Sequence, residues 1–188
     1  MADAPALPPA PPFPSAHVPR SPGEEAALLA ALLVRPWTAD LCPRAWFTEG
    51  PSRRLRDWLA APSTALAVDH AVDAYRAARS DALFAAGDPA GAADALAADV
   101  PSGAVVQAIA DGIGREAETH PVGSADANAW WDVRFLAHAL HDAALRLPEL
   151  RAAGLATLAV VEASAPPGVK RAPRVDPYQT EAYRRAAA

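Results

Sequence analysis

The chain of 188 residues carries a net charge of −5, and hydrophobic residues fill 52% of its positions. Most of these apolar residues are alanine rather than β-branched, which favours helix over sheet, and the length suits one domain with one core. The longest apolar run is about half of the roughly 20 residues that a membrane span needs, and no signal-peptide pattern opens the sequence. We therefore expect a cytoplasmic helical protein that does not enter a membrane.

Charge and proline divide the chain into three parts. Residues 1–22 balance their charges and are rich in proline, residues 23–165 carry 11 basic against 19 acidic groups, and residues 166–188 carry five against two. Proline removes backbone donors and favours polyproline II. We predict a disordered proline-rich arm over 1–22, a helical domain over 23–165 and a disordered basic tail over 166–188. The acidic domain lacks the clustered cations of a broad, nonspecific DNA-binding surface.

Helical spacing and capping residues predict the first elements of the domain. A leucine stripe over residues 24–34 ends before Pro36. Ser52 is positioned to cap a second helix, which turns Leu55 and Leu59 inward.

The middle of the chain continues in the same manner. A third helix, over roughly residues 64–86, ends at the Gly87-Asp88-Pro89 break. Asp88 then caps a short alanine-rich helix that runs to about residue 98. Ser102 caps a further helix, whose apolar residues are Val105, Val106, Ile109 and Ile113. No segment alternates apolar and polar residues for long enough to require a strand.

The last two predicted helices cover residues 126–147 and 149–163, and the proline between them favours an antiparallel hairpin. The first of these helices has an apolar surface too wide for packing on one neighbour. We therefore predict a protein-interaction surface formed by Trp130, Trp131, Arg134, Phe135 and Leu136. The alternative is that both faces pack inside one monomeric bundle, because tryptophan is common in cores as well as interfaces. The predicted fold class is all-α, with a helical bundle followed by a helical hairpin and disordered tails at both ends.

Two blocks of the sequence carry a family resemblance. Glu25 to Leu33 reads E-x-x-L-L-x-x-L-L, and Ala45-Trp46-Phe47 is followed by Arg53-Arg54-Leu55 and Trp58. The second block, SADANAWWDVRFL, runs from Ser124 to Leu136. In this order the blocks resemble the N-terminal, non-motor domain of the DnaB family of replicative helicases. The chain departs from that family at Ser52, where the family has histidine, and in the longer stretch over residues 60–122.

The resemblance implies a helical interaction domain that stands alone, without the helicase motor. A G-x-x-x-x-G-K-[ST] phosphate loop is absent, since the only lysine, Lys170, follows Pro167-Gly168-Val169. In the DnaB family the hairpin at this position pairs with another copy and helps to form the surface that meets primase. We therefore predict a nonenzymatic, cofactor-free adaptor or regulator in DNA replication or genome maintenance, whose partner is a replicative helicase, a primase or a second copy.

A second hypothesis is a small repair factor that binds single-stranded or damaged DNA at the nucleoid. Phosphates would be held by Arg53, Arg54 and Arg56, while neighbouring tryptophan and phenylalanine rings stack with bases. The tail would extend this contact through Lys170, Arg171 and Arg174. The competing interpretation is that the rings belong to the core and the arginines to a solvated face.

No catalytic or metal site is predicted. His138 and His141 are close enough on a helix to share a ligand, but no H-E-x-x-H pattern or nucleophile elbow accompanies them. Cys42 is the only cysteine, so it forms no internal disulfide and no zinc site on its own. We interpret it as a buried, inert thiol.

Overall fold

The computed structural model describes residues 18–97 and 102–165, and this part of the chain is helical throughout, with no strand. The prediction of an all-α fold is thereby confirmed. The predicted tail over 166–188, and residues 1–17 of the predicted arm, lie outside the described residues. In chain order the elements are α1 (Pro22–Val34), η2 (Pro36–Leu41), η3 (Arg44–Trp46), α2 (Pro51–Ala60), α3 (Pro62–Ala85), α4 (Pro89–Ala97), α5 (Ser102–Glu118), α6 (Ala125–Arg146) and α7 (Pro148–Ser164).

Helix α1 forms the centre of the core. The Ser21 hydroxyl accepts a hydrogen bond from the Glu24 amide and caps the helix, and Pro36 follows its last turn as predicted. Every residue from Ala27 to Leu33 is buried, so the expected leucine stripe is part of a helix covered on all sides. A helix that is apolar all round is stable in water only when neighbours surround it. Those neighbours are α2, α5, α6, α7 and η2.

Helix α7 approaches α1 closely enough for backbone contact. A Cβ atom added at Gly154 would meet the carbonyl oxygen of Ala27, and the Cβ of Ala31 would lie 3.0 Å away. Gly154 is buried, with Leu158 and Val161 following it on the same inward face. Only glycine leaves room for this separation between the two helix axes.

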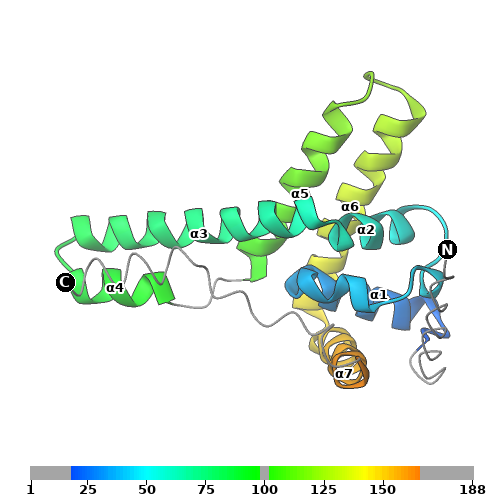
Figure 1. Ribbon diagram of the computed structural model, residues 1–188, viewed down its shortest axis with the longest axis horizontal. Coiled ribbons are helices and arrows are strands. Elements are labelled where there is room, and N and C mark those ends of the chain that lie inside the picture. Colours follow the sequence, from blue (N-terminus) through cyan, green and yellow to red (C-terminus); the bar gives the residue numbers. More distant parts are fainter. Residues whose placement is uncertain (1–17, 98–101, 166–188) are drawn as a thin grey trace, which may run out of the picture.

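Two helix pairs project from this core (Figure 1). In the first pair, α4 folds back along α3 after a turn at Gly87, whose φ of 82° suits glycine. The second pair is α5 and α6, joined by a short connection at its tip. The structure therefore contains a helical hairpin, but its arms are α5 and α6 rather than the predicted helices 126–147 and 149–163. Helix α7 turns away after Pro148 and packs mainly on α1.

The predicted capping residues have mixed outcomes. The Asp88 cap is confirmed, since its Oδ1 accepts a hydrogen bond from the Gly91 amide at 2.8 Å. The Ser52 cap is wrong, because α2 begins one residue earlier at Pro51 and its N-cap is Gly50 at φ 102°. Proline at the first helical position has no amide hydrogen that needs a partner, which favours this earlier start. The side chain of Ser102 lies outside the described part.

We expect Gly154→Ala to lower the free energy of unfolding by about 1–3 kcal/mol, because the added methyl group forces α1 and α7 apart. The matched control is Gly114→Ala in α5, where the nearest neighbour of the new Cβ would be Arg134 at 3.6 Å. That control should be neutral or more stable by up to about 1 kcal/mol, since alanine is the better helix former. Urea denaturation of both variants measures the difference, and equal effects would contradict the close contact.

Candidate protein-interaction surface on α6

Helix α6 has one face in the core and one face in solvent. The Ser124 hydroxyl accepts a hydrogen bond from the Ala127 amide and fixes the start of the helix. The inward residues recur at helical spacing and are all buried: Ala127, Val133, Ala137, Leu140 and Ala144. They pack toward α1, α2 and α5, so the rotation of α6 about its axis is determined by the core.

The opposite side of α6 carries large apolar side chains in water. We call Trp131, Asp132, Phe135, Asp142 and Leu145 the outer face of α6. Phe135 is 76% exposed, Leu145 59% and Trp131 40%. Large apolar side chains that recur along one helix face are typical of a surface that binds another molecule, whereas isolated ones are not.

The structure separates the five predicted interaction residues into two groups. Trp130 and Leu136 are partly buried and pack against the core. The guanidinium of Arg54 lies 5.5 Å from the centre of the Trp130 ring, which ties α2 to α6. Of the predicted set, Trp131 and Phe135 are the members that face solvent.

Arg134 belongs to the hairpin rather than to a free surface. Its guanidinium lies 5.2 Å from the Trp131 ring centre and 3.7 Å from a carboxylate oxygen of Asp111 on α5. Its Nε is buried and has no hydrogen-bond acceptor among the described residues. Arg134 thus holds the ring of Trp131 in place and links α6 to α5.

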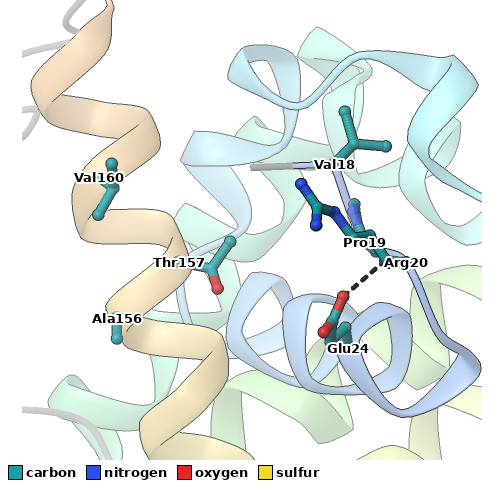
Figure 2. A pocket seen from close by; sticks show the side chains of 7 residues that line it. All are labelled: Val18, Pro19, Arg20, Glu24, Ala156, Thr157 and Val160. Carbon is teal, nitrogen blue, oxygen red and sulfur yellow. Dashed lines mark hydrogen bonds between the residues drawn. The ribbon is translucent and has the colours of Figure 1, made fainter. Parts of the chain in front are cut away.

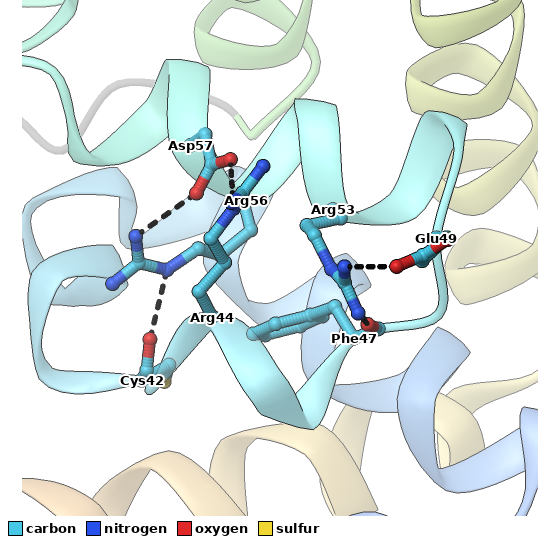
Figure 3. Close-up of polar contacts among 7 residues, drawn as sticks. All are labelled: Cys42, Arg44, Phe47, Glu49, Arg53, Arg56 and Asp57. Atoms are coloured by element: carbon cyan, nitrogen blue, oxygen red, sulfur yellow. Dashed lines mark hydrogen bonds and ion pairs between the residues drawn. The ribbon is translucent and has the colours of Figure 1, made fainter.

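Two of the three predicted DNA-binding arginines are bound to the protein itself (Figure 3). Arg53 donates to the carbonyl of Phe47 at 3.1 and 3.2 Å and pairs with Glu49 at 2.9 Å. Arg56 donates to the carbonyl of Cys42 at 2.8 Å and pairs with Asp57 at 3.2 Å. These bonds fasten the connection between α1 and α2 onto α2.

The rings near those arginines are part of the core. Trp46 and Phe47 are buried, and Trp58 is partly buried where its ring passes over Gly112 of α5. Stacking with bases requires an exposed ring face, which Trp46 and Phe47 do not offer. Lys170, Arg171 and Arg174 lie outside the described residues.

A pocket of about 490 Å³ lies between the segment before α1 and helix α7 (Figure 2). Its polar lining consists of Arg20, Glu24 and Thr157, and the Arg20 amide donates to Glu24 Oε2 at 2.6 Å. These groups include no nucleophile next to a base, so the pocket offers no recognisable catalytic arrangement. Within the described chain, no three metal-ligating side chains come together. His138 and His141 are both partly buried on α6.

Several exposed apolar side chains were not anticipated from the sequence. Trp37 is half-exposed on η2, Phe84 is exposed near the end of α3, and Val160 is exposed on α7. They are scattered over separate elements and do not continue the outer face of α6. In the sequence, the signal that pointed to Trp131 and Phe135 was the width of the apolar surface on the predicted helix 126–147.

The comparisons with known proteins returned nothing: no family model matches this chain, and neither does any curated protein or solved structure. None of the helices in the described ranges has both the length and the apolar character required to cross a membrane. The function must therefore be argued from the surface itself.

Cys42 lies at the end of η2 and is fully buried. Burial raises the pKa of its thiol from an ordinary 9.0 to about 12, although the nearby Arg56 opposes the shift. Because the folded protein keeps the thiol protonated, Cys42 adds stability that is fully present below pH 9 and is lost as the pH rises toward 12.

We expect Cys42 of the native protein to react at pH 8 with a thiol-specific disulfide reagent roughly a thousandfold more slowly than the unfolded chain, which follows from three pKa units of difference. The same measurement in denaturant supplies the reference rate. A second check compares the pH dependence of stability between pH 9 and 12 with that of Cys42→Ala, which lacks the thiol. Rapid native reaction would contradict the burial.

Proposed function

We propose that this protein is a nonenzymatic adaptor or regulator in DNA replication or genome maintenance, which acts by presenting the outer face of α6 to another protein. The candidate partners are a replicative helicase, a primase or a second copy of the chain, and the compartment is the cytoplasm. The exposure of Phe135 carries this proposal. A phenylalanine that is 76% exposed in the middle of a long, well-anchored helix buries little apolar surface within the described part of its own chain, so covering it by a partner removes that surface from water.

The energetics support binding at this face. Covering a large apolar side chain stabilises a complex by roughly 1.5–3 kcal/mol, and three such side chains lie along α6. The helix needs little rearrangement to bind, because Val133, Ala137 and Leu140 hold it in the core. Preorganised surfaces lose less conformational entropy on association.

The assignment to replication depends on the resemblance to the non-motor domain of DnaB helicases. The two blocks that carry the resemblance are neighbours in the structure, since α1 packs against α2 and α6. The longer stretch that departs from the family corresponds largely to α3, α4 and α5. A core that joins both blocks supports the proposed resemblance.

Direct DNA binding receives less support. Arg53 and Arg56 already donate to backbone carbonyls and carboxylates, and Arg54 lies on Trp130. A gel shift with single-stranded DNA, repeated at rising salt, tests this alternative. We expect that the protein does not retard the DNA, or that Arg53→Gln leaves any retardation unchanged. Binding that weakens with salt and with this substitution would favour the repair factor instead.

Phe135→Asp should abolish association while leaving helical content nearly unchanged, because the new carboxylate lies in water. The matched control is Val133→Asp, two residues away on the buried face, where an unpaired charge should unfold the protein. Circular dichroism and sedimentation separate the two outcomes. Loss of helix in Phe135→Asp would show that this residue belongs to the core and would reject the interface.

The partner is identified by affinity capture from the source cell with the wild type and with Phe135→Asp, before and after nuclease treatment. We expect replication proteins to be captured by the wild type, to survive nuclease and to be absent with the variant. Recovery that depends on intact DNA would overturn the adaptor role.

A further inference from the structure

The α5–α6 hairpin is acidic as well as apolar. From Ser102 to Leu147 it carries six carboxylates and three arginines, so its formal charge is −3. One of the three arginines, Arg134, is already engaged with Trp131 and Asp111. A binding partner of the hairpin must therefore combine apolar contact area with positive charge.

Two of the carboxylates belong to the outer face of α6 itself. Asp132 and Asp142 are exposed, and neither pairs with a cation in the part of the chain that the structure describes. Asp142 lies on the same stripe as Trp131, Phe135 and Leu145, whereas Asp132 flanks this stripe, because successive residues of a helix point in different directions. The face thus offers apolar contacts with unpaired negative charge within and beside them.

The last 23 residues of the chain have the complementary composition. Residues 166–188 contain five basic and two acidic groups, a formal charge of +3, together with Tyr178 and Tyr183. Tyrosine and arginine are among the side chains that are enriched at protein interfaces. The other basic, aromatic stretch, residues 44–58, is already engaged in the fold, since Arg53 and Arg56 donate to backbone carbonyls and Trp46 and Phe47 are buried.

The segment is also long enough to reach the hairpin. Helix α7 starts directly after α6 and spans about 26 Å, at 1.5 Å per residue over its 17 residues. An extended chain advances up to about 3.3 Å per residue, so 23 residues cover as much as roughly 75 Å beyond Ala165. By the same measure Arg174 can lie up to about 30 Å from Ala165, Tyr178 up to about 43 Å and Tyr183 up to about 59 Å. Arg174 can therefore approach Asp142, and the tyrosines can approach Phe135 and Trp131, whereas Lys170, at up to about 17 Å, stays closer to the end of α7.

We propose that residues 166–188 bind in cis across the outer face of α6 and compete with the external partner for it. This inference builds on the proposed function, because it describes how the same surface is regulated. The basic groups pair with Asp132 and Asp142, and the tyrosines cover Phe135 and Trp131. Binding of a partner then requires displacement of the chain's own tail, so the tail lowers the affinity of the surface for other proteins.

The full-length, ¹⁵N-labelled protein tests this proposal by NMR. We expect backbone amides of residues 166–188 to show restricted motion in low salt, with the Trp131 indole signal shifted. Both effects should disappear as salt rises from about 0.02 M to about 0.5 M, because the attraction between exposed charges is screened. Tail amides that are fully mobile at low salt would overturn the proposal.

Charge-reversal variants make the test specific to α6. Asp132→Lys with Asp142→Lys should release the tail, whereas Asp81→Lys with Asp94→Lys, the same change at exposed carboxylates of α3 and α4, should leave it bound. If both double variants release the tail, the tail is held by general charge attraction and the proposed site on α6 is wrong. A mixture of labelled and unlabelled chains detects a tail bound to a second copy, which would overturn binding in cis.

The triple variant Lys170→Glu, Arg171→Glu, Arg174→Glu separates this inference from the proposed function. If both are correct, it frees the tail and raises affinity for the captured partner several-fold. If the partner binds the triple variant and the wild type with equal affinity, only the competition between the tail and the partner is rejected. A tail that binds α6 in a protein that captures no partner rejects the adaptor role and leaves the intramolecular site intact.

Discussion

The close approach of α1 and α7 is the constraint on which the rest of the fold depends. Helix α1 is apolar on all sides, so it is stable only when fully enclosed. Its neighbours α2, α5 and α6 cover part of its circumference, and α7 closes the remainder at Gly154. This contact explains why α7 leaves α6 after Pro148 instead of running back along it. Because α7 packs on α1, it is not available to cover the outer face of α6, which is exposed among the described residues.

The orientation of α6 is fixed by contacts on the side of the helix that faces α2 and α5. Trp58 on α2 packs over Gly112 on α5, and Arg54 on α2 stacks on Trp130. Both contacts join the α5–α6 hairpin to α2. The connection between α1 and α2 is itself held by Arg53 and Arg56, which donate to the backbone carbonyls of Phe47 and Cys42. The arginines that suggested nucleic-acid binding thus contribute to the rigidity of a protein-binding face.

The sequence predicted the positions of the helices better than it predicted which helices pack against one another. Periodicity and prolines located α1 and the Asp88 cap, because these features depend on residues close in the chain. The partner of α6 was not predictable, since it depends on Gly154, whose role appears only when α1 lies beside it. The sequence showed that the helix with Trp131 and Phe135 has more apolar surface than one neighbour can cover. It did not show which of the aromatic rings on that helix belong to the core. The roles of Arg53 and Arg56 were missed because their acceptors are main-chain oxygens, which leave no mark in the sequence.

The packing of the α3–α4 pair affects how easily this part of the protein opens locally. Its mutual packing relies on small buried residues such as Ala92 and Ala95, with one side-chain hydrogen bond from Ser80 to the Ala92 carbonyl. Small side chains remove little apolar area from water, so this pair contributes less per residue than the leucines around α1. Local opening of α4 therefore exposes little hydrophobic surface and can occur without loss of the central helix. We therefore expect the α3–α4 pair to open locally without unfolding of the core. Its amide hydrogens should exchange through openings of lower free energy than those that expose the amides of α1.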